Sequence, residues 1–172
     1  MTRQSLSELL RGAEGPPSVM GIVDVVLRDE NGEIVHHEHK HNLITDQFRT
    51  YWVTNNNQEI GAFYVFINEN IEAMHAKRSA MRTILPGTWA QNITPSKDGP
   101  NRIWTYATVF APPPVTRTFK TVGLTRAIEN GGYTNIDGGP NSIVAATVLS
   151  SAITQTTAQT LEVNYRLAFQ RT

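Results

Sequence analysis

The sequence predicts a mainly β protein, an antiparallel β-sandwich or jelly roll of about seven strands with a short N-terminal helical arm. Short runs of β-favouring residues are separated by turn-rich segments, and the run from Leu161 to Gln170 alternates apolar and polar residues without a break. Asn31-Gly32, between two such runs, is the strongest short signal for a hairpin. Strands do not alternate with long helical segments, so a βαβ fold is not expected.

Residues 1–17 are expected to form an arm and linker ahead of a single β-sandwich domain over residues 18–172. Ser5 and Glu8 have the spacing of a capping box, which predicts a short helix. Three leucines share one face of that helix: Leu6, Leu9 and Leu10. Because a helix of about two turns is marginal on its own, these leucines are candidate subunit contacts. They would dock either on their own domain or on a neighbouring subunit.

The domain is predicted to begin with the hairpin GIVDVVLRDENGEIVHHEHKHNLI, whose strands flank the Asn-Gly turn. Thr45 or Asp46 could then cap a short helix. Residues 62–67 predict an apolar, aromatic strand. Residues 68–100 stay open between helix and loop, because their apolar spacing permits a helix while several prolines and glycines favour a loop.

The second part of the chain predicts further strands over residues 102–110, 115–124, 143–149 and 161–169. The triple proline that precedes Val115 indicates a stiff connector. Alternate residues of the last strand share one face and are expected to line the core: Leu161, Val163, Tyr165, Leu167 and Phe169. Glu162, Asn164 and Arg166 are expected on the opposite face.

Composition limits the function classes. The 15 basic and 15 acidic residues balance, so the basic excess of a nucleic-acid-binding protein is missing. There is no cysteine, hence no disulfide and no thiol nucleophile. Neither a signal-peptide core nor an apolar run of about 20 residues is present, which indicates synthesis in the cytoplasm and no membrane partner. Only 17% of the residues are charged, which indicates a surface that is neutral, rich in threonine and asparagine, or covered by a partner.

Four of the five histidines crowd into the stretch VHHEHKH. On a strand, His37, His39 and His41 project from one face and His36 from the other. A His-x-His pair can chelate a transition metal, which makes the first three weak metal candidates. A jelly-roll oxygenase of the cupin type would add a nearby glutamate and a distant histidine, and only His75 remains for the latter. The pattern favours a solvated or interfacial imidazole ladder, with a metal shared between symmetry-related subunits as the alternative.

No catalytic motif stands out, because GxSxG, P-loop, GxGxxG and HExxH patterns are all missing. We therefore expect no catalytic residue, no cofactor and no small-molecule substrate. Tryptophans raise the alternative of carbohydrate binding. Trp104 shares a strand face with Tyr106 and Phe110, which is typical of a core, and Trp52 lies on the apolar face of the expected helix. Trp89 is then the exposed candidate.

Three segments carry a resemblance to a known family. The opening hairpin ends in HNLITDQFR, APPP later precedes TRTFKTVGL, and the chain closes with AATVLSSAITQTTAQTLEVNYRLAF. In the same order, tailed-bacteriophage virion proteins carry NLITN.GR, a proline-bearing stretch before IN.IGL, and L..PI.QT....LEV.YRL.F, so about half of the chain resembles that family. The resemblance implies a tail, collar, fibre-like or capsid-decorating component and brings no catalytic residue with it.

The expected function is a non-enzymatic structural subunit of a bacteriophage virion, in the tail, the collar or neck, or a related assembly. Its partners would be copies of itself in a symmetric oligomer and other virion proteins, without nucleic acid or membrane. Its location would be the virion, after synthesis in the host cytoplasm. The alternatives are a capsid decoration or cement protein, a carbohydrate-binding receptor-recognition module and, less favoured, a histidine-metal jelly-roll enzyme.

Overall fold

The computed structural model describes residues 18–44, 63–68, 89–93, 95–100, 102–125 and 143–170 of the chain. These residues form nine strands joined only by antiparallel pairing, and no helix occurs among them. The mainly β, antiparallel class is therefore confirmed. Nor does this part of the chain contain a helix long and apolar enough to span a membrane. The expected helical arm over residues 1–17, and the helix expected after Thr45, lie outside the described residues.

In chain order the strands are β1 (Ser18–Arg28), β2 (Ile34–Ile44), β3 (Phe63–Asn68), β4 (Trp89–Ile93), β5 (Ser96–Asp98), β6 (Ile103–Phe110), β7 (Arg117–Thr125), β8 (Ile143–Gln155) and β9 (Thr160–Gln170). All except β4 and β5 coincide with strands that the sequence predicts. These two short strands lie in the segment 68–100, where prolines and glycines conceal the β pattern.

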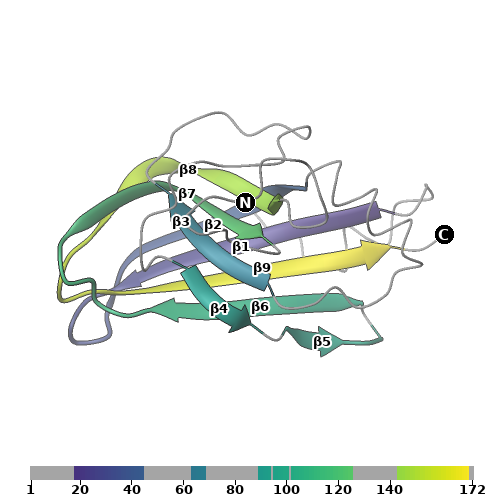
Figure 1. Ribbon diagram of the computed structural model, residues 1–172, viewed down its shortest axis with the longest axis horizontal. Helices are drawn as coiled ribbons and strands as arrows, with labels where there is room; N and C mark the ends of the chain where they lie inside the picture. Colours follow the sequence, from purple (N-terminus) through teal and green to yellow (C-terminus); the bar gives the residue numbers. More distant parts are fainter. Residues whose placement is uncertain are drawn as a thin grey trace.

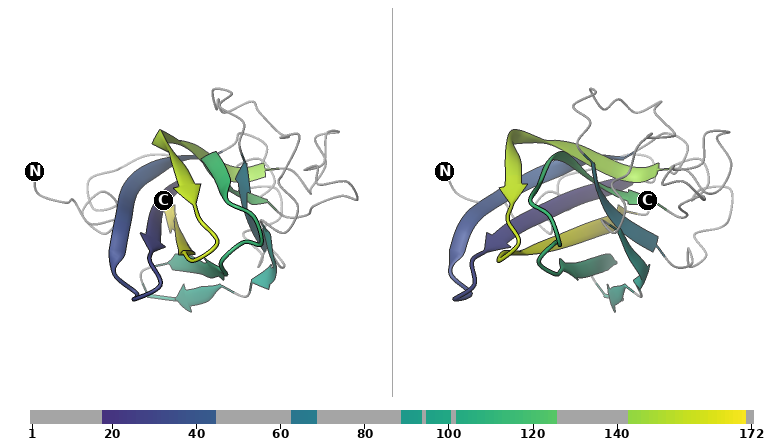
Figure 2. Two further views of the ribbon diagram at one scale, coloured as in Figure 1. Left: turned by 90° about the vertical axis from the view of Figure 1, so that its left-hand side faces the viewer. Right: turned by 60° about the vertical axis from the view of Figure 1, so that its left-hand side comes forward.

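The strands form one sheet in the order β4-β3-β7-β8-β2-β1-β9-β6-β5. The sheet folds over between β2 and β8, whose ladder contains only the pairs Leu43–Ala146 and Ile44–Ala145. The first half consists of β2, β1, β9, β6 and β5, and the second half of β8, β7, β3 and β4. The two halves face each other in Figures 1 and 2, and residues of β4 approach β6, so the two ends of the folded sheet come close together.

A single core fills the space between the halves. Alternate residues of β1, β6 and β9 supply one side of the core, and residues of β3, β7 and β8 supply the other. The core face predicted for the last strand is confirmed, since none of its residues is more than 6% exposed: Leu161, Val163, Tyr165, Leu167 and Phe169. Glu162, Asn164 and Arg166 lie half-buried on the outer surface, as the alternation predicts.

The β1–β2 turn forms at the Asn-Gly pair as predicted. Gly32 adopts a φ of 82°, which glycine accepts readily, and its amide donates to the carbonyl of Asp29 at 3.1 Å. The Oδ1 atom of Asp29 accepts hydrogen bonds of 2.9 Å from the backbone amides of Asn31 and Glu33. These bonds fix the hairpin and thereby the alignment of β1 with β2.

Gln155 ties three strand ends together inside the fold. Its side chain is fully buried, and its Oε1 accepts bonds from Arg117 at 2.9 Å (Nε) and 2.7 Å (Nη2). Its Nε2 donates to the carbonyl of Gln159 at 2.8 Å and faces those of Phe110 and Ala111 at 3.5 and 3.4 Å. Because both polar atoms of the amide are hydrogen-bonded, its burial is not penalised. The contacts connect the end of β6, the start of β7 and the end of β8.

Candidate functional site on the histidine strand

The outer surface of β2 meets charged residues of two neighbouring strands. Asp24 on β1 lies directly opposite His39, and Arg166 on β9 is the diagonal neighbour of Asp24 on its other side. His37 and His41 flank His39 on the same face, because the side-chain period of a strand is two. The shared face of the three histidines follows from the strand period and is confirmed, whereas neither charged partner was expected from the sequence.

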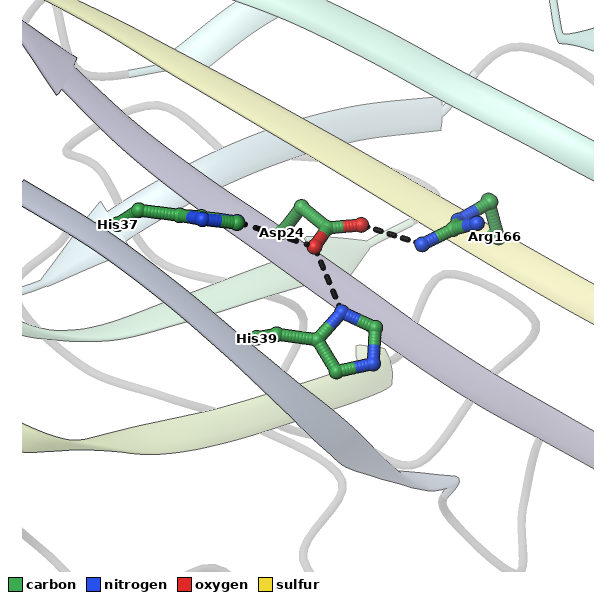
Figure 3. A network of polar contacts seen from close by, with 4 residues as sticks. All are labelled: Asp24, His37, His39 and Arg166. Carbon is green, nitrogen blue, oxygen red and sulfur yellow. Dashed lines mark hydrogen bonds and ion pairs between the residues drawn. The ribbon is translucent and has the colours of Figure 1, made fainter. Parts of the chain in front are cut away.

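Asp24 is the centre of a network of polar contacts (Figure 3). Its Oδ1 atom is 2.6 Å from Nδ1 of His39 and 3.4 Å from Nε2 of His37. Its Oδ2 atom accepts a charge-assisted hydrogen bond from Nη2 of Arg166. An ionised carboxylate can only accept, so both ring nitrogens that face Asp24 act as donors. The network joins β2, β1 and β9 across the outer surface of the first half.

The charge of Asp24 is maintained by these neighbours. Burial of its carboxyl raises the pKa, but the hydrogen bond from His39 and the positive charge of Arg166 outweigh burial and hold the pKa below its usual value. Asp24 therefore remains ionised at neutral pH, and Arg166 balances its charge. The cluster is neutral as long as the two imidazoles are neutral.

The network uses only two of the three metal candidates. His41 is exposed, and its ring meets that of His39 edge-on with 6.5 Å between the ring centroids, so it does not reach Asp24. Among the described residues, no group of three or more histidine, aspartate, glutamate or cysteine side chains is arranged to hold a metal ion. Arg166 also brings a positive charge to the one carboxylate that a cation would need. His37 and His39 act here as hydrogen-bond donors.

The Asn31-Gly32 pair predicts that the flanking strands form a hairpin, but the partner of Asp24 depends on a bulge. The turn sets Arg28 opposite Ile34, and the extra residue Val35 then shifts the register so that Asp24 lies opposite His39. For Arg166 there was no local signal, because its approach depends on the pairing of β9 with β1 across most of the chain.

The inner face of β2 binds the second half of the sheet. Beyond the two ladder pairs with β8, the strands are joined by side chains instead of backbone hydrogen bonds. Glu38 accepts a bond of 2.7 Å from the amide of Ser150, and Lys40 donates one of 2.9 Å to the carbonyl of Val148. Lys40 and Glu38 also pair at 3.2 Å, and Nε2 of His36 lies 3.6 Å from Glu38. We call this group of His36, Glu38 and Lys40 the β2–β8 seam.

Glu38 is the anchor of the β2–β8 seam, and its side chain is only 10% exposed. Burial raises the pKa of its carboxyl, but the bond from the Ser150 amide and the nearby Lys40 outweigh that effect and lower the pKa. The charged carboxylate thus remains available to bind the backbone of β8. Both faces of the VHHEHKH stretch are therefore occupied by contacts that hold strands together.

A shallow groove of about 190 Å³ lies on the outer surface between β6 and β9. It is lined by Ala107, Thr108, Val109, Glu162 and Asn164. Glu162 carries the only carboxylate among these residues, and it forms an ion pair of 2.7 Å with Arg28 of β1. The described lining is otherwise small and uncharged, which offers little to fix a small ligand in one orientation.

Trp104 is the one tryptophan whose side chain the structure describes. It packs against the core, with its ring centroid 4.8 Å from that of Phe169, and Nζ of Lys97 lies 5.0 Å from the ring centroid. This half-buried position agrees with the expected core role and leaves little of the ring for stacking on a sugar. Other candidates lie outside what the structure describes: the subunit-contact leucines Leu6, Leu9 and Leu10, His75, Trp52, and the side chain of Trp89.

Comparison with known proteins gives no relative from which a function could be transferred. No family model matches the chain, and it has no match among curated proteins or among solved structures.

Proposed function

We propose that the chain is a non-enzymatic structural subunit of a bacteriophage virion, in the tail, the collar or neck, or a related assembly. The observation that carries the proposal is that the clustered polar side chains bind neighbouring strands of their own chain. Strand β2, which contains His36, His37, His39 and His41, carries the densest cluster of ionisable groups in the described residues. The network around Asp24 joins β2 to β1 and β9, and the β2–β8 seam joins β2 to β8. These contacts build a rigid module, which is what a subunit of a repeated assembly requires.

The segments that resemble virion proteins support the proposal by their position in the fold. HNLIT contains the last residues of β2, TRTFKTVGL coincides with most of β7, and the closing segment spans β8, its turn and β9. These strands, together with β1, are consecutive in the sheet order from β7 to β9. The resemblance therefore falls on one connected block of the sheet instead of scattered surface positions.

In this proposal the folded sheet acts as the β-sandwich module. Its two halves share one core, and the Gln155 contacts and the β2–β8 seam fasten the halves to each other. Residues 1–17 would act as the connecting arm, with the three arm leucines packed on a neighbouring subunit. Function then consists of repeated protein–protein contacts between rigid bodies.

A capsid decoration protein would place the same demands on the fold, so the location of the protein in the particle separates the two roles. The test is quantitative mass spectrometry of purified virions from the phage or prophage that encodes the chain, followed by immunogold labelling. We expect a stoichiometric copy number that matches a ring at the tail or neck, with label at that position. A label spread over the capsid surface would favour decoration. Particles that contain the other virion proteins but lack this one would contradict the proposal.

A further inference from the structure

Among the described residues, the two ends of the first half carry opposite net charge. The β1–β2 turn closes one end of β1. The β5–β6 turn lies near the other end, because Ile103 at the start of β6 and Met20 near the start of β1 both pair with Ala168 of β9. Figure 1 shows the two turns at opposite ends of the molecule. With 11 residues in β1, they are separated by roughly 35 Å.

The first of these ends, which we call the acidic turn, consists of Glu30, Glu33, Ile34 and Val35. Both glutamates are exposed, and the backbone amide of Glu33, not its carboxylate, takes part in the turn. Ile34 and Val35 are 54% and 50% exposed, two of the four large apolar side chains exposed in the described residues. Val35 is the extra residue of a bulge. Leu27 pairs with His36 and Arg28 pairs with Ile34, so Val35 has no partner on β1. The bulge interrupts the regular hydrogen-bonding ladder and so disfavours backbone pairing with a strand of another molecule. A contact at the acidic turn would therefore be made by side chains.

The opposite end, which we call the basic turn, carries Lys97, Asp98 and Arg102, so the net charge of these three side chains is +1. Arg102 is exposed and has a φ of 52°, and it is the only residue other than glycine with a positive φ in the described part of the chain. Asparagine, aspartate or glycine would adopt this conformation with less strain. A strained backbone that carries a long charged side chain to the surface points to a role for that side chain.

We propose that the acidic turn of one copy docks on the basic turn of the next copy, so that subunits associate head to tail. The opposite charges bring the two ends together, and Ile34 and Val35 supply apolar surface that the contact removes from water. Because the two surfaces differ, the contact is heterologous and generates a ring when the rotation closes. This inference rests on the proposed function, because it specifies how the subunits of the assembly meet.

The test is a charge swap in the full-length protein, followed by sedimentation velocity at low and at physiological ionic strength. Glu30→Lys/Glu33→Lys and, separately, Arg102→Glu are expected to weaken self-association about tenfold or more at low salt. In the combined variant the acidic turn gains two lysines and the basic turn changes from a net charge of +1 to −1. The attraction is then restored with reversed signs, and association is expected to return to within about threefold of wild type. Neither substitution removes a side-chain contact that the structure records, and circular dichroism verifies folding of each variant.

Two matched controls locate the effect. Ser151→Lys adds a positive charge to an exposed position on β8 and should leave association unchanged. Val35→Ser should weaken association, whereas Val109→Ser, at a valine of β6 that is 64% exposed and lies three strands away from Val35, should not.

The proposed contact is overturned if the combined variant self-associates as weakly as the two separate charge-reversal variants. It is also overturned if Ser151→Lys weakens self-association as much as they do. A wild-type protein that remains monomeric up to about 1 mM at low salt also overturns it. None of these results decides the virion role, which the presence or absence of the protein in purified particles tests separately.

Discussion

His39 donates a hydrogen bond of 2.6 Å from Nδ1 to Oδ1 of Asp24, its direct neighbour across the β1–β2 hairpin. The same carboxylate receives Arg166 from the opposite side, so three strands of the first half converge on one acidic group. This relationship explains how a histidine-rich strand can serve structure.

Replacing Asp24 by asparagine should destabilise the fold, because it removes the charge that balances Arg166 and weakens the bond to His39. We expect a loss of about 1 kcal/mol in the free energy of unfolding, kept small by the partial exposure of the partners. Urea unfolding measures this loss, with Glu33→Gln as the control at an exposed acid that should change stability by less than about 0.5 kcal/mol. Additive effects of Asp24→Asn and Arg166→Gln in a double-mutant cycle would contradict the coupling.

The pH dependence of stability should reflect the lowered pKa values of Asp24 and Glu38. A carboxyl whose pKa is lower in the folded state stabilises the protein above its unfolded-state pKa of about 4, and that contribution is lost as the pH falls through the folded-state value. Urea unfolding at pH 6, 4 and 3 should therefore show a smaller loss of stability for Asp24→Asn/Glu38→Gln than for wild type. Equal losses for both proteins would mean that these carboxyls are not the groups responsible.

Tyr165 tests both the strand register and the cost of a buried hydroxyl. Its side chain is fully buried and its hydroxyl has no hydrogen-bond partner among the described residues. Tyr165→Phe should leave the free energy of unfolding unchanged or raise it by up to about 1 kcal/mol. Tyr165→Asp should prevent folding, whereas Asn164→Asp on the outer face should be mild. A marked loss in Tyr165→Phe would show that the hydroxyl is hydrogen-bonded, and equal effects of the two aspartates would mean that the register is wrong.

The arm carries a prediction that does not depend on the histidine strand. Deletion of residues 1–17 should leave a folded domain, because β1 begins at Ser18 and the described strands supply the core. The same deletion should abolish assembly, as should Leu6→Ser/Leu9→Ser/Leu10→Ser in the full-length chain. Light scattering measures assembly and circular dichroism verifies folding. Assembly that persists unchanged in both variants would exclude the arm as the connector.

Local pattern predicted those parts of the fold that depend on local chemistry. The Asn-Gly turn follows from the φ freedom of Gly32, and the core face of β9 follows from the two-residue period of a strand. The short strands β4 and β5 escaped prediction, because their stability depends on pairing with β3 and β6 and not on their own sequence.

The candidate site was predictable only in part, for the same reason. The division of the histidines between two faces required only the period of the strand. The contact of Arg166 with Asp24 and the reach of Glu38 to Ser150 required the order of strands in the folded sheet, which no local pattern specifies. The β2–β8 seam exists because the sheet folds over there, and that fold depends on how the two halves pack around their shared core.

The most direct test of assembly through protein contacts is native mass spectrometry of the full-length protein with and without a strong chelator. We expect a closed homo-oligomer whose mass equals a whole number of chains and does not change on chelation, because the histidines hold strands within each subunit. An oligomer that carries stoichiometric metal and dissociates when the chelator removes it would contradict the account and make His37, His39 and His41 ligands of a shared metal clamp.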